Sequence, residues 1–110
     1  MAHYDFGIMN RAPEHGERYD SYEPEKYSAI AVLDDAIEPV LTECSGLDCF
    51  WHTLDWPAKG FTWCGITLIP PESAEEMASI IADRDTELRK LAELLTNAGA
   101  QGKFVICFGI

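Results

Sequence analysis

The clearest hydrophobic pattern begins at residue 27. Residues 27–33 (YSAIAVL) are a short apolar run that ends at the acidic residues Asp34 and Asp35, which predicts a strand. Asp35 and Glu38 then have the spacing of a capping box, and Pro39 predicts a late helix start, because proline is tolerated only in a first helical turn. The apolar face of this helix, at i, i+3, i+4 and i+7, is Ile37, Val40, Leu41 and Cys44.

Two aromatic and β-branched runs follow, at residues 49–56 and 61–69. The intervening residues 57–60 (PAKG) are turn formers, so the pattern predicts a β-hairpin.

The rest of the chain has the pattern of a helical region and a terminal strand. Ser73 and Glu76 have the spacing of a second capping box, which predicts the start of a helix. We expect this helix to be broken near Asp83, and Asp85 to cap the helical part that follows. The apolar faces of the two parts are Met77, Ile80, Ile81, Leu88, Leu91, Ala92 and Leu95. Residues 103–110 are apolar at nearly every position, as in a strand covered on both faces.

The beginning of the chain differs in character. Residues 10–26 are polar, contain prolines and have no hydrophobic period, which predicts a loop or arm. A short strand at residues 4–9 is only weakly indicated, because the segment is brief and contains Gly7. We therefore expect an N-terminal arm at residues 1–26 and a single α+β domain at residues 27–110.

The element order from residue 27 is β, α, β, β, broken α, β, the order of a ferredoxin-like βαββαβ sandwich. We expect its first and last strands to pair at the sheet centre and the hairpin to supply both edges. A different two-layer α/β sandwich is the alternative.

Large side chains lie on both faces of the expected hairpin. One face carries Phe50, Leu54, Trp56, Phe61 and Trp63, and the other carries Trp51, Cys64, Ile66 and Leu68. Two helices cover only one face of a sheet, so the second needs another cover. The candidates are the arm, with Phe6, Ile8, Tyr19 and Tyr22, a second copy of the chain in a homodimer, or a partner protein.

Charge narrows the choice of partners. The 110 residues carry a formal net charge of −11, and residues 34–83 hold ten acids but one base, Lys59. Nucleic acids and anionic membranes are disfavoured, because both would be repelled, whereas a basic protein would be steered towards this surface. The N-terminus lacks a basic region followed by an apolar one, so we expect a cytoplasmic protein with reduced cysteines.

Chemical motifs are sparse. The sequence has no Gly-rich phosphate loop, His-Glu-x-x-His, Cys-x-x-Cys or Gly-x-Ser-x-Gly motif, and we expect no cofactor. The side chains with zinc-ligand chemistry are Cys44, Cys49, His52 and Cys64, but their spacing is irregular. In a strand, Cys49 and His52 point to opposite faces, which argues against both a zinc site and a Cys–His nucleophile pair.

Two classes of function remain open. The first is a non-catalytic protein-binding module, such as an immunity-type inhibitor of a basic partner. Its expected contact residues are Trp51, Trp56, Phe61, Trp63, Glu38, Glu43, Asp48 and Asp55. The second is a small enzyme or ligand-binding domain, with His52 and Asp55 as acid and base near the hairpin.

Residues 65–73 (GITLIPPES), preceded by the aromatic 51–54 stretch and followed by the terminal 108–110 (FGI), resemble a group of short uncharacterised bacterial proteins. The resemblance covers roughly residues 27–110. It implies a bacterial cytosolic protein of one module, with a fixed strand-to-helix junction at residues 70–73, and it implies no activity.

Overall fold

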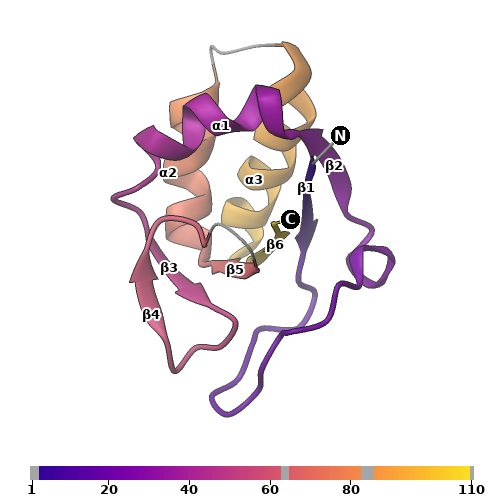
Figure 1. Cartoon of the computed structure of the whole chain (residues 1–110), viewed down its shortest axis with the longest axis vertical. Coiled ribbons are helices and arrows are strands. Elements are labelled where there is room, and N and C mark those ends of the chain that lie inside the picture. Colours follow the sequence, from indigo (N-terminus) through magenta and orange to yellow (C-terminus); the bar gives the residue numbers. More distant parts are fainter. Residues whose placement is uncertain (1–2, 63–64, 83–85, 110) are drawn as a thin grey trace.

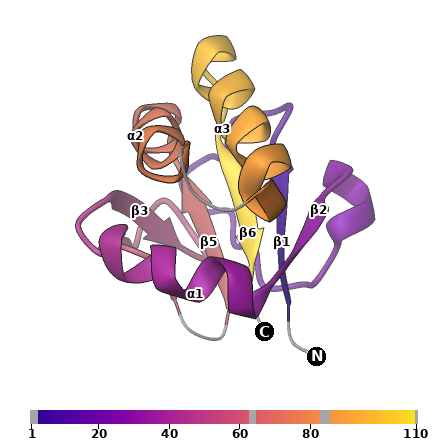
Figure 2. The ribbon, with the colours of Figure 1, turned by 90° about the horizontal axis from the view of Figure 1, so that it is seen from above.

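A computed structural model describes residues 3–62, 65–82 and 86–109. They form an antiparallel six-stranded sheet with three α-helices on one face (Figures 1 and 2), which confirms the α+β class. The strands are β1 (His3–Ile8), β2 (Ile30–Leu33), β3 (Asp48–Trp51), β4 (Pro57–Lys59), β5 (Ile66–Ile69) and β6 (Val105–Phe108). The helices are α1 (Asp34–Glu43), α2 (Pro71–Ile81) and α3 (Arg89–Gln101), with short 3₁₀ helices η1 (Pro24–Tyr27) and η2 (Thr86–Leu88). Among these residues, no helix has the length and apolar character needed to cross a bilayer.

The strand order is β2-β1-β6-β5-β3-β4, which differs from the ferredoxin-like prediction in both number and order. β2, expected at the centre beside β6, is an edge strand, because β1 lies between them. β3 does pair with β5, but residues 57–59, predicted as part of a turn, form the additional edge strand β4. Helix α1 connects β2 to β3, which lie four strand positions apart. The helix is about 15 Å long and the two strands are about 19 Å apart, so α1 spans most of the distance between them.

The weakly indicated first strand is an integral part of this sheet. Gly7 weakens the strand pattern, but a steric constraint explains why glycine is present. A Cβ built at this position would lie 2.6 Å from the Cβ of Tyr27. Glycine thus allows the chain near η1 to cross β1 at close range.

The helices begin differently from the two capping-box predictions. Helix α1 starts at Asp34, after Leu33 and without a side-chain cap, and Pro39 lies inside it, so the predicted late start was wrong. Helix α2 starts at Pro71, and the Ser73 hydroxyl donates instead to the Asp48 carbonyl at 2.6 Å. Ser73 therefore ties α2 to β3. The predicted cap at Asp85 and the predicted break at Asp83 lie outside the described residues.

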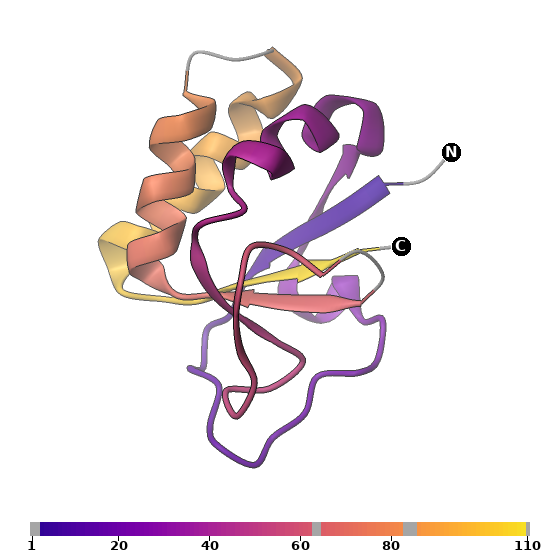
Figure 3. The ribbon, with the colours of Figure 1, turned by 60° about the vertical axis from the view of Figure 1, so that its left-hand side comes forward.

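The two faces of the sheet are covered by different parts of the chain (Figure 3). Alternate strand residues such as Phe6 and Val105 pack against the helices, whereas Leu68 and Phe108 pack on the opposite face. Residues 10–26, the covering segment, run across that opposite face, where Tyr19 and Tyr22 contribute to the packing. The prediction that the arm covers the second face of the sheet is correct for these two tyrosines. It is wrong for Phe6 and Ile8, which belong to the core on the helix side.

Candidate functional site

A hollow of about 610 Å³ lies between α1 and the β3–β4 hairpin. We call it the docking hollow. Its wall includes apolar and aromatic side chains from three parts of the chain, and its rim carries charged ones. The lining residues used below are Tyr4, Glu38, Leu41, Trp51, Lys59 and Phe61.

The aromatic wall of the docking hollow is held in place by specific contacts. The indole Nε1–H of Trp51 donates to the Gly60 carbonyl at 3.0 Å, and Phe61 packs edge-to-face on Phe6 at 6.2 Å. Gly60 has a φ of +74°, and a Cβ there would lie 3.0 Å from the Cα of Ser45, so this position requires glycine. The rings therefore present a fixed apolar surface.

The aromatic surface extends out of the hollow through Trp56. Its ring packs edge-on against Trp51, with centroids 5.8 Å apart and planes at 60°. Among the described residues, Trp56 belongs to the large hydrophobic ones that are exposed, at 49%. An exposed tryptophan backed by a fixed one is typical of an interface anchor.

The rim of the docking hollow is acidic. Glu38 is exposed on α1, and the ammonium of Lys59 is bonded to Asp48 across the β3–β4 pair. That carboxylate raises the pKa of Lys59, and the nearby Glu76 acts in the same direction. The one base of residues 34–83 is thus locally neutralised, which leaves the rim with excess negative charge.

The structure gathers some of the predicted contact residues and separates others. Glu38, Trp51 and Phe61 line one hollow, and Trp56 and Asp48 adjoin it. Glu43 lies in the last turn of α1 and is not part of the lining. Asp55 faces the covering segment instead, and Trp63 lies outside the described residues.

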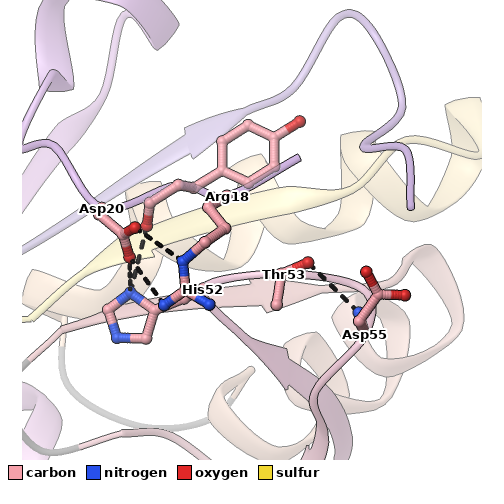
Figure 4. Close-up of polar contacts among 6 residues, drawn as sticks. Arg18, Asp20, His52, Thr53 and Asp55 are labelled. Carbon is pink, nitrogen blue, oxygen red and sulfur yellow. Dashed lines mark hydrogen bonds and ion pairs between the residues drawn. The ribbon is translucent and has the colours of Figure 1, made fainter. Parts of the chain in front are cut away.

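The suggested acid–base residues have separate partners, and Figure 4 shows the contact of His52 with Asp20. Nδ1 of His52 lies 2.9 Å from Oδ1 of Asp20 and 3.2 Å from the Tyr19 carbonyl oxygen. Both neighbours are acceptors, so Nδ1 is the protonated nitrogen. Asp55 accepts instead from His15 Nδ1 at 2.7 Å and from the Gly16 amide at 3.0 Å. His52 and Asp55 therefore each bind the covering segment rather than one shared reaction centre.

Both aspartates in these contacts favour their charged form. The hydrogen bond from Arg18, and then the charge of Arg18, lower the pKa of Asp20, and His52 contributes less in the same direction. The bonds from His15 and from the Gly16 amide lower the pKa of Asp55. The carboxylates are consequently available as acceptors throughout the neutral range.

The cysteines are placed as core side chains. Cys44 and Cys49 lie in the helix-side core, and burial raises the pKa of the Cys49 thiol to about 12, so it is protonated at neutral pH. Among the described residues, no three His, Cys, Asp or Glu side chains gather as a metal site, and Cys64 lies outside them.

One polar cluster was not predicted from the sequence. Asp5 is buried in β1, where it accepts a hydrogen bond from the Tyr22 hydroxyl at 2.5 Å and lies 3.3 Å from Nε2 of His3. This bond raises the pKa of Tyr22. The cluster fastens the covering segment to the sheet. The available signal was the alternation of Tyr4, Phe6 and Ile8, which places Asp5 on the opposite face of β1.

Comparison of the chain with protein-family profiles, with curated proteins and with solved structures finds no match.

Proposed function

We propose that this chain is a non-catalytic protein-binding module that captures a basic partner at the docking hollow. The observation that carries the proposal is the combination, at one site, of fixed aromatic rings with an acidic rim whose lysine is neutralised. Immunity-type inhibition of a basic protein, such as a nuclease, is a role of this kind.

Two physical effects support a cationic occupant. The net charge of −11 attracts a basic protein at long range and accelerates its association, an effect that falls with ionic strength. At contact, a guanidinium or ammonium group is stabilised by an aromatic face and a nearby carboxylate, here Trp51 and Glu38. Arginine suits such a site best, because its planar group both stacks on rings and forms paired hydrogen bonds.

The first test titrates the full chain with a blocked hexapeptide of alternating serine and arginine, followed by NMR. We expect the amide signals of residues 38, 40–45 and 58–62 and the indole Nε1–H of Trp51 to shift. The control peptide contains citrulline in place of arginine; it keeps the shape of the side chain but not its charge, and it should produce no comparable shift.

Paired variants distinguish this site from the overall charge. Glu38→Lys should weaken binding of the arginine peptide by at least about fivefold, because it reverses a charge at the rim. Glu93→Lys makes the same change at an exposed site on α3 and should weaken binding by less than about twofold at 150 mM salt. Equal effects of the two variants, or equal binding of the citrulline peptide, would contradict the proposal.

A further inference from the structure

The turn between β3 and β4, residues 52–56, is held by the covering segment at two histidine–aspartate contacts. In one, His52 of the turn meets Asp20 of the segment; in the other, His15 of the segment meets Asp55 of the turn. The two contacts hold opposite ends of the turn, with His52 and Asp55 pointing in different directions (Figure 4). The backbone adds a bond from the Tyr19 amide to the His52 carbonyl at 2.7 Å.

This turn needs such support because its first residue is strained. His52 has a φ of +65°, a left-handed conformation that is unfavourable for a residue other than glycine. Strain of this kind persists only where surrounding contacts determine the conformation. The contacts with Asp20 and with Tyr19 meet that requirement at the strained residue itself, together with the bond from the His52 amide to the Ile66 carbonyl at 2.9 Å.

The same turn carries Trp56. The Trp51 amide donates to the Trp56 carbonyl at 3.0 Å, and the two indole rings pack together. The His52 ring lies 6.3 Å from the Trp56 ring. A chain of contacts thus runs from the covering segment through the turn to Trp56, and from Trp56 to Trp51 in the docking hollow.

We propose that His15 and Asp20 are positioning residues of the docking surface, which fix the turn so that Trp56 extends the aromatic wall toward an arginine of the partner. The inference rests on the proposed function. An ordered aromatic side chain loses less conformational entropy on binding than a mobile one, so fixing it in advance raises affinity without adding a contact. The covering segment therefore has two roles, since it also covers the second face of the sheet.

The test is a double-mutant cycle on binding of the same arginine hexapeptide. His15→Ala with Asp20→Asn should weaken binding roughly two- to tenfold, the range expected when one ordered side chain becomes free. In a Trp56→Ala background the same pair of changes should have no further effect, because the residue that they position is absent. A merely structural role would weaken binding equally in both backgrounds.

The variants are chosen to keep the result interpretable. Glu14→Gln is the control for Asp20→Asn, because it removes one negative charge from the covering segment at an exposed residue. His15→Ala alone changes a side chain that is 77% exposed, so it tests the inference even if the double variant does not fold. Additive effects with Trp56→Ala would overturn this inference and leave the proposed function standing. Loss of the difference between Glu38→Lys and Glu93→Lys would overturn the proposed function itself.

Discussion

Gly7 shows how one residue controls the packing of the covering segment on the sheet. An alanine Cβ at this position would lie 2.6 Å from the Tyr27 Cβ and 3.0 Å from its carbonyl oxygen, so the chain near η1 must move. We expect Gly7→Ala to lower the free energy of unfolding by about 1–3 kcal/mol, as measured by urea denaturation. Gly46→Ala is the control, because a Cβ there meets nothing within 4 Å, and it should be nearly neutral. Equal losses for the two variants would contradict a steric role for Gly7.

The residues of the docking surface show which parts of a site a sequence can reveal. Trp51, Trp56 and Phe61 were predicted as contact residues because aromatic side chains are typical interface anchors. The structure places them together, although strand alternation had predicted Trp51 on the face opposite Trp56 and Phe61. That face assignment was wrong, because β3 ends at Trp51 and residues 52–56 form a turn. The partner of His52 was not predicted. Asp20 lies 32 positions away in a segment without any periodic pattern, and no local rule relates the two.

Among the elements, β1 determines whether residues 27–110 can form a domain alone. Among the strands that the structure describes, β2 pairs only with β1, and β6 loses one of its two neighbours when β1 is removed. We expect a fragment of residues 27–110 to lack a dispersed NMR spectrum, because it would expose both the β2 edge and the buried face around Phe108. Addition of a peptide of residues 1–26 should restore the dispersion. A dispersed spectrum of the fragment alone would instead support the arm-plus-domain division.

The elements that were predicted correctly are those with a strong local pattern. The apolar faces of α1 and α3 and the fully buried β6 follow from residues close in sequence. The strand order depends on contacts between distant segments, and β1 contains Asp5 and Gly7, which are uncommon inside strands. Both residues serve the covering segment, through the Tyr22 hydrogen bond and the close approach of Tyr27. The pattern was therefore obscured by a tertiary contact.

At the scale of the whole molecule, buried thiols limit stability in alkaline solution. Burial raises the pKa of Cys49 from 9.0 to about 12 and raises that of Cys107 well above its ordinary value. At a pH between the ordinary pKa and the raised pKa of a thiol, the unfolded chain loses the thiol proton while the folded chain keeps it. Rising pH therefore favours unfolding. We expect the free energy of unfolding to fall above pH 9 by about 1.4 kcal/mol per pH unit for each thiol. Urea denaturation at pH 8 to 11 measures this slope.

The contribution of the thiols can be separated from other alkaline effects by the slope of the free energy of unfolding against pH. Burial and the hydrogen bond to Glu17 raise the pKa of Tyr19 to about 12, so this tyrosine adds a decline above pH 10 that is common to all variants. Cys107→Ala should reduce the slope by about 1.4 kcal/mol per pH unit, because one proton difference between the two states is removed. Val105→Ala is the matched control on the same face of β6; it should lower stability at every pH and leave the slope unchanged. An unchanged slope in Cys107→Ala would show that its thiol does not set the alkaline limit.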